Sequence, residues 1–150
     1  MIHNGKILSN VIANQKIHEE FGGVVPDSEG WPEWYWSISP KLWNTAGEKR
    51  SKAIKPEVVG QYAQLTMHSM QHGQLKFVVN GSNASWKEVE ENVDSFRQAG
   101  CDFPVWIMGV GGTLEGLKIT EAMIADEAIQ RGYNYTSRVH VHIYGNAIGK

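Results

Sequence analysis

Alternating apolar and polar residues predict three strands in this chain, at residues 35–39, 74–80 and 138–144. In each segment every second residue is apolar, and successive side chains on a strand point to opposite faces. Each strand therefore has one apolar face and one polar face. The polar faces carry Tyr35, Ser37 and Ser39 on the first strand, Lys76 and Asn80 on the second, and His140, His142 and Tyr144 on the third. This asymmetry predicts helices over the apolar side and a cavity lined by polar groups on the other.

Three longer segments have apolar residues near helical spacing. The first covers about residues 56–71. The second begins at Ser85, where Glu88 completes a capping box, and ends at Gly100. The third covers about residues 117–130. The residues expected inside are Val59, Tyr62, Ala63, Met67 and Met70, then Trp86, Val89, Val93 and Phe96, then Ala122, Ile124, Ala125, Ala128 and Ile129.

A fourth strand is predicted at residues 105–108, after Pro104. It is apolar on both faces, which is typical of a central strand in a covered parallel sheet. Strands that alternate with helices indicate βαβ units, and right-handed crossovers place active groups at the carboxyl ends of the strands. The predicted fold class is α/β. Four strands and three helices make about half of a TIM-like (β/α)₈ barrel, or a small open sheet.

The first 30 residues have a different pattern. Residues 6–13 predict a strand, and Gly22, Gly23 and Pro26 predict a turn and linker. We therefore divide the chain into an N-terminal β segment with a linker, residues 1–30, and a partial β/α barrel, residues 31–150.

Composition limits the function classes. A chain of 150 residues with 41% hydrophobic and 20% charged residues suits one globular domain. The net charge of −2 gives no electrostatic signature of nucleic-acid or membrane binding. No apolar run approaches the ~20 residues of a membrane span, and no signal peptide opens the chain, so we expect a cytoplasmic protein. The single cysteine, Cys101, cannot hold an iron–sulfur cluster or a structural zinc without further ligands, and we expect it to be buried near a helix end.

The histidines and Lys76 are the first candidates for chemistry. A lysine inside a covered parallel strand is costly unless it is paired or solvated in a cavity, and the alternative is a lysine that reaches solvent from an edge strand. His140 and His142 can bind a polar ligand, act as acid or base, or be hydrogen-bonded structural residues. They lack an obvious third metal ligand, so we expect no metal site. His68 and His72 lie one helical turn apart and are expected on an exposed face.

Two loops after strands are further candidates. Gly111, Gly112 and Thr113 stand between a strand and a helix, where free backbone N–H groups can hold an anion, although such glycines also serve turn geometry. Ser39 and Lys41 stand just past another strand, on either side of Pro40, where they could meet a carboxylate or a ribose. That segment is equally compatible with an ordinary loop.

Four segments in order, residues 36–42, 74–79, 110–113 and 139–146, resemble the C-terminal half of the radical-SAM enzyme 7-carboxy-7-deazaguanine synthase. The resemblance covers about residues 31–150. It implies ring contraction of 6-carboxy-tetrahydropterin in the biosynthesis of queuosine precursors, within a partial β/α barrel. It also implies the cofactors S-adenosylmethionine, a [4Fe–4S] cluster and magnesium.

The resemblance assigns roles to matching residues. Ser39, Lys41 and Lys76 become candidate cofactor-binding residues, and His140, His142, Gly111 and Gly112 become candidate substrate-binding residues. The family's three-cysteine motif lies in an N-terminal half that this chain does not have. One cysteine cannot replace three thiolate ligands, so we expect no radical chemistry unless a second chain supplies the cluster.

Residues 4–26 resemble an early segment of the transferase that forms threonylcarbamoyladenosine in tRNA. This match of about 23 residues is below the ~40 at which a chain usually folds unaided. Three interpretations of the whole chain stay open. It is half of a split enzyme, a stand-alone α/β module that binds a purine-like or pterin-like molecule, or a degenerate fragment without activity.

Overall fold

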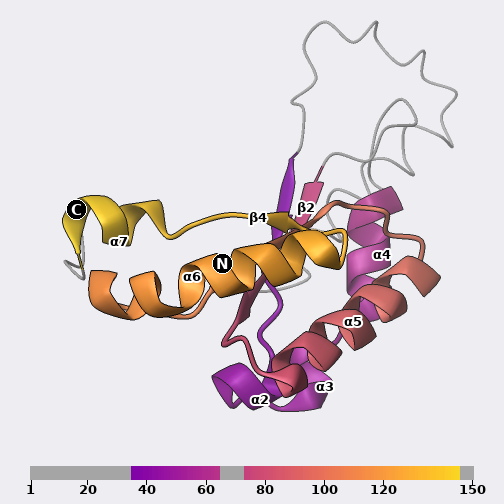
Figure 1. Cartoon of the computed structure of the whole chain (residues 1–150). Helices are drawn as coiled ribbons and strands as arrows, with labels where there is room; N and C mark the ends of the chain where they lie inside the picture. Colours follow the sequence, from indigo (N-terminus) through magenta and orange to yellow (C-terminus); the bar gives the residue numbers. More distant parts are fainter. Residues whose placement is uncertain (1–34, 65–72, 146–150) are drawn as a thin grey trace, which may run out of the picture.

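The computed structural model describes residues 35–64 and 73–145 and places four parallel strands in one sheet. The strands are β1 (Trp36–Ile38), β2 (Gly73–Val79), β3 (Val105–Gly109) and β4 (Asn134–Tyr135), and they lie side by side in sequence order. The helices between and after them are α2 (Trp43–Ala46), α3 (Arg50–Ala53), α4 (Pro56–Gln64), α5 (Asn83–Gln98), α6 (Leu114–Gln130) and α7 (Val139–Tyr144) (Figure 1). The predicted α/β class is confirmed.

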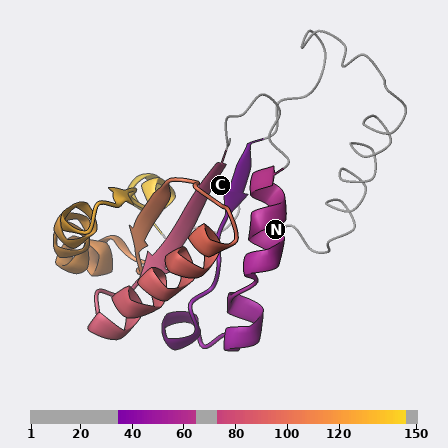
Figure 2. The same cartoon turned by 90° about the vertical axis from the view of Figure 1, so that its right-hand side faces the viewer.

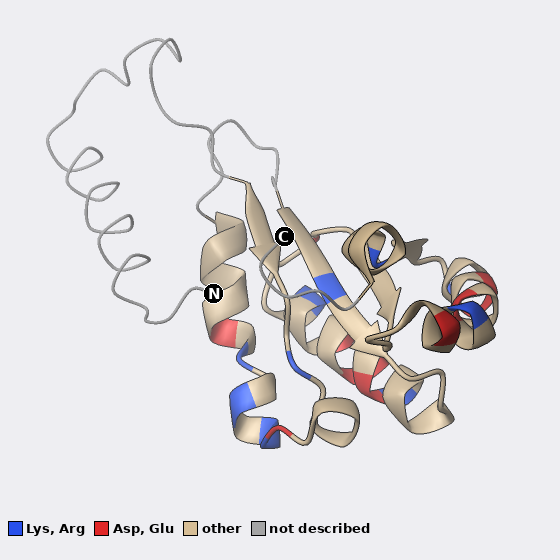
Figure 3. Cartoon of the chain, turned by 90° about the vertical axis from the view of Figure 1, so that its left-hand side faces the viewer, with Lys and Arg blue, Asp and Glu red and all other residues tan. Residues whose placement is uncertain are grey.

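One face of the sheet packs against α4, α5 and the C-terminal half of α6. Leu75, Phe77 and Val79 of β2 pair in register with Val105, Ile107 and Gly109 of β3, and all six residues are buried. They share one hydrophobic core with side chains of α4, α5 and α6. Figure 2 shows α5 in front of the strands, and Figure 3 looks at the strands from the opposite side. The position of these helices follows from the order of the strands. When parallel strands lie in sequence order and every crossover is right-handed, each connecting helix packs on the same side of the sheet.

Helix α5 begins earlier than its sequence pattern predicts. Its N-cap is Ser82, whose hydroxyl accepts a hydrogen bond from the backbone N–H of Ser85 at 3.2 Å. The capping box predicted at Ser85 and Glu88 is therefore wrong. The predicted buried stripe is confirmed, since Trp86, Val89, Val93 and Phe96 are all buried. The chain leaves the helix through Gly100, whose φ of 86° is a left-handed conformation that glycine adopts without strain.

Helix α6 also begins earlier, at Leu114, and its buried side differs from the predicted one. Leu117, Ile124 and Ala128 face the core. Ala122 and Ile129, which we expected inside, are exposed. The helix is therefore apolar on two sides, and only one of them packs on the sheet.

The end of the chain contains the largest correction. Residues 139–144 form helix α7, not the predicted strand, and the fourth strand is the two-residue β4. The ladder ends where the backbone N–H of Thr136 donates to the carbonyl of Ile107 at 2.9 Å. Residues two apart in a helix point about 200° apart, so His140 and His142 do not share a face.

Several predictions lie outside the described residues. These are the strand at 6–13, the turn at 22–26, the end of the first helix at 65–71, and the pair His68 and His72. The first helix is confirmed over residues 56–64. Among the described residues, no helix combines the length and the apolar character needed to cross a bilayer.

Candidate functional site

The side chains on the second face of the sheet are polar and aromatic as well as aliphatic. Gln74, Lys76 and Val78 of β2 are half-buried, as are Trp106 and Met108 of β3. Lys76 is the register partner of Trp106, so the two side chains leave the sheet on the same face. In Figure 3 the blue segment of β2 is Lys76. We call these five residues and Ser37 the second-face group.

A hydrogen bond joins β1 to β2 within the second-face group. The amide Nε2 of Gln74 donates to the Oγ of Ser37 at 2.9 Å. Ser39 and Lys41 follow β1 and are exposed, whereas Leu42 is buried and anchors the start of α2. The sequence thus predicted the face of Lys76 and the loop position of Ser39 and Lys41 correctly.

The loop after β3 has a close backbone approach. A Cβ on Gly111 would lie 2.8 Å from the Cδ2 of Leu117, which leaves little room for a side chain there. Thr113 is the N-cap of α6 and accepts a hydrogen bond from the N–H of Gly116 at 3.2 Å. The carbonyl of Gly111 accepts a hydrogen bond from the guanidinium of Arg138. Packing, capping and this contact account for the glycine loop without a ligand.

His142 pairs with α6. Its Nε2 lies 3.1 Å from Oε2 and 3.3 Å from Oε1 of Glu121. The Tyr135 hydroxyl donates to Oε1 of the same carboxylate at 2.9 Å. Burial, and then the Glu121 carboxylate, raise the pKa of the Tyr135 phenol, so it stays a proton donor near neutral pH. The three side chains fasten α7 to α6 and β4.

The structure therefore groups some predicted site residues and separates others. Lys76 lies on the same face as Trp106 and Gln74. The sequence pattern indicated Lys76 as a site residue but neither of the other two. His142 pairs with Glu121 of α6, and His140 is exposed on α7. Sequence reasoning missed Trp106 because β3 is apolar on both faces, and it missed Glu121 because no local pattern marks a tertiary ion pair.

A polar cluster lies between α2 and α5. Glu88 is 2% exposed, and its Oε1 accepts a hydrogen bond from the backbone N–H of Asn44 at 2.7 Å. Burial raises the pKa of Glu88, and hydrogen bonds from Asn44 lower it in part. Its Oε2, the Oδ1 of Asn92 and the Oγ1 of Thr45 are buried and accept no hydrogen bond from the described residues. A protonated Glu88 would add a hydrogen-bond donor to this cluster of buried oxygens.

Neither a metal centre nor an iron–sulfur site fits the described residues. They contain no group of three His, Cys, Asp or Glu side chains arranged to hold a metal ion. Cys101 is fully buried after α5, as we expected, and burial raises the pKa of its thiol. A neutral thiol in the core is not a ligand that an incoming cluster can reach.

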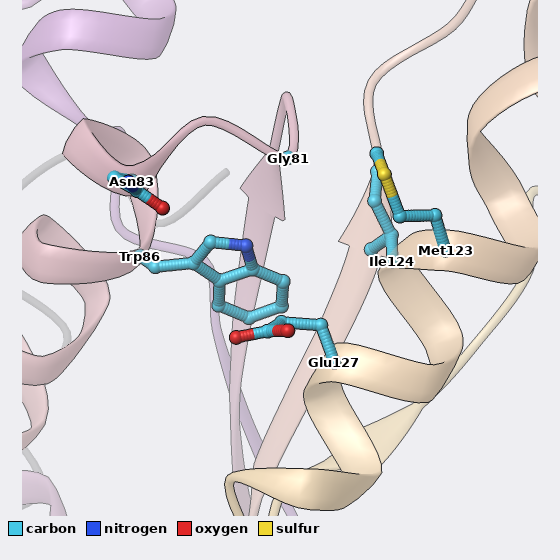
Figure 4. A pocket seen from close by; sticks show the side chains of 6 residues that line it. All are labelled: Gly81, Asn83, Trp86, Met123, Ile124 and Glu127. Atoms are coloured by element: carbon cyan, nitrogen blue, oxygen red, sulfur yellow. The ribbon is translucent and has the colours of Figure 1, made fainter.

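A cavity of about 90 Å³ lies in the helix layer, away from the second-face group. It is lined by Gly81, Asn83 and Trp86 on one side and by Met123, Ile124 and Glu127 of α6 on the other (Figure 4). Sites for small molecules usually enclose about 300–1,000 Å³. We therefore do not place the functional site in this cavity.

Comparison with known proteins found one short match. The tRNA N6-adenosine threonylcarbamoyltransferase of Christiangramia forsetii is 71% identical over 24 residues, which are 16% of this chain and 7% of that protein. A short similarity to this transferase is thus confirmed, over a small fraction of its length. No family model matches the chain, and no solved structure matches it. The resemblance of residues 31–150 to deazaguanine synthase has no support from these comparisons and stays a prediction.

Proposed function

We propose that residues 31–150 are the C-terminal half of a β/α-barrel enzyme similar to 7-carboxy-7-deazaguanine synthase, and that a second polypeptide supplies the half with the cluster. The observation that carries the proposal is the sheet of four parallel strands in sequence order, one face of which shares a single hydrophobic core with α4, α5 and the C-terminal half of α6. A β/α barrel has its helices outside and its strands inside. The second-face group would then line the interior.

The second-face group suits a carboxylated heterocycle. The Lys76 ammonium can pair with a carboxylate, and the Trp106 indole beside it can stack on a planar ring. The Gln74 amide adds a hydrogen-bonding group, already oriented by Ser37. These groups favour a pterin-like or purine-like molecule with an acidic substituent, such as 6-carboxy-tetrahydropterin.

The remaining candidates take outer positions. In the proposed enzyme Ser39 and Lys41 lie at the carboxyl end of β1, where S-adenosylmethionine would bind, and Gly111 and Gly112 lie at the carboxyl end of β3. His142 is held by Glu121, so we propose that it positions α7 and does not line the interior. The cluster ligands have to come from the second polypeptide, because Cys101 is single and buried.

Co-expression tests the split enzyme. The full chain is purified without oxygen, alone and with a candidate polypeptide that carries C-x₃-C-x₂-C, and iron content and formation of 5′-deoxyadenosine are measured. We expect no iron and no cleavage for the chain alone, and both for the complex. If the cysteine-bearing polypeptide does not bind this chain and is equally active without it, the proposal is wrong.

The second-face group also supports a simpler function, a stand-alone module that binds such a heterocycle. The half-buried Lys76 and Trp106 exist in this chain without any partner. Fluorescence titration of 6-carboxypterin with the full chain distinguishes the two functions. Saturable binding that a cysteine-bearing polypeptide does not change favours the module, and binding that requires the polypeptide favours the split enzyme.

A further inference from the structure

The side of α6 that faces away from the sheet exposes several apolar side chains. Ile119, Met123 and Ile129 are 81%, 56% and 66% exposed, and Ala122 between them is exposed too. Ile119, Ala122, Asp126 and Ile129 follow the alternating three- and four-residue spacing of a helix–helix seam. We call these four residues and Met123 the α6 stripe. On the opposite side of the helix Leu117, Ile124 and Ala128 are buried, and the last two belong to the core that the helix shares with the sheet.

We infer that the α6 stripe binds the α6 stripe of a second copy of this chain, with the two helices antiparallel. A surface helix normally has one apolar side, so exposed apolar side chains on a second side favour a partner there. The stripe is self-complementary about a two-fold axis, as a symmetric dimer requires. This inference does not depend on the proposed function, since the stripe lies on the outer side of the helix layer.

Charge determines the direction of the two helices. Lys118 borders the stripe in its N-terminal half, and Asp126 lies on it in its C-terminal half, both exposed. When Ile119 packs beside Ile129 of the second copy, Lys118 comes within about one helical turn of Asp126 of that copy. Parallel helices would instead place Asp126 beside Asp126. Antiparallel packing also aligns the two helix dipoles favourably.

The size of the stripe sets the strength of the dimer. One helix pair buries less area than a standard protein interface, so we expect weak association with a Kd of about 10 μM or higher. Met123 of the stripe also helps to line the cavity between α5 and α6.

Sedimentation equilibrium of the full chain over a range of concentrations tests the inference. We expect a reversible monomer–dimer equilibrium for the unmodified chain and a monomer for Ile129→Glu. Ile143→Glu on α7 is the matched control, since Ile143 is 62% exposed and lies off the stripe, and it should dimerise as the unmodified chain does. Circular dichroism verifies that each variant is folded.

Charge reversal tests the direction. Lys118→Glu and Asp126→Lys should each weaken dimerisation by about tenfold, because each turns two attractive contacts into repulsive ones. The double variant should restore the affinity of the dimer. A monomer at every concentration overturns the inference, as does equal dissociation by Ile143→Glu. Failure of the double variant to recover overturns the antiparallel arrangement.

Discussion

Lys76 is a charged residue on a strand that has a neighbouring strand on each side. Lys76 is half-buried on the same face as its register partner Trp106, and an ion pair of a half-buried ammonium with a ligand is stronger than one in open water. We expect Lys76→Ala to weaken binding of 6-carboxypterin by about ten- to a hundredfold, the range of a charge-assisted hydrogen bond. Fluorescence titration measures this loss.

Lys87 provides the control for Lys76. It is exposed on α5, in the helix layer, and Lys87→Ala should leave the binding unchanged. The thermal midpoint of Lys76→Ala should stay close to that of the unmodified chain. If both variants bind equally well, or if Lys76→Ala loses stability as much as affinity, then Lys76 is a structural residue and not a ligand contact.

Glu88 makes the stability of the chain depend on pH. Burial raises its pKa in the folded protein, so the folded state binds this proton more tightly than the unfolded chain does. The stability from Glu88 is present in full below the unfolded pKa near 4.5 and is lost as the pH rises through the higher folded pKa. Glutamine copies the neutral acid, and its amide can donate to the buried acceptors of Asn92 or Thr45.

We therefore expect Glu88→Gln to raise the free energy of unfolding at pH 7 and to flatten its pH dependence above pH 4.5. Urea unfolding at a series of pH values measures both effects. Glu57→Gln on α4 is the control, because Glu57 is exposed, and it should leave the pH profile unchanged. A Glu88→Gln protein that is less stable at pH 7 than the unmodified chain would show that the ionised carboxylate is the form the core accommodates.

At the scale of the elements, the N-terminus of α5 offers a direct test of the observed cap. Ser82 accepts from the N–H of Ser85, and Asn80 accepts in turn from both the N–H and the hydroxyl of Ser82, at 3.0 and 2.7 Å. Ser82→Ala should cost about 1 kcal/mol of unfolding free energy, as the loss of an N-cap usually does. Ser82→Asp, which keeps an acceptor at the cap, should cost much less. Equal losses in chemical denaturation would mean that the cap does not stabilise α5.

The sequence predicts elements well where one period persists over many residues. The stripe from Trp86 to Phe96 spans most of α5, and the alternation in β2 spans seven residues, so both elements were predicted. Residues 139–144 contain only six residues, too few to separate two periods. Their β-branched valines favour a strand locally, but Tyr135 already occupies the place beside β3. Only the three-dimensional structure shows that this place is taken.

At the scale of the whole molecule, the sheet of parallel strands follows from the order of the elements, whereas the grouping of site residues does not. Alternating strands and helices predict parallel strands, and handedness then predicts helices on one face. Which side chains meet depends on register, and no local pattern reveals that Lys76 pairs with Trp106 or that His142 reaches Glu121. The predicted common face of His140 and His142 is wrong because residues 139–144 form a helix, and the role of the second face as a site stays a prediction.

The second-face group and the α6 stripe can be distinguished in one experiment, because each contains an oxidisable methionine. Met108 is half-buried on the second face, and Met123 is 56% exposed on the stripe. In oxidative footprinting read by mass spectrometry, a cluster-bearing polypeptide should protect Met108 and leave Met123 unchanged. Raising the concentration of the chain by itself should protect Met123 and leave Met108 unchanged. Because the two methionines belong to different surfaces, protection of Met108 by self-association would mean that two copies pair through their sheets. In that case the second face, not α6, would be the surface that the second copy covers.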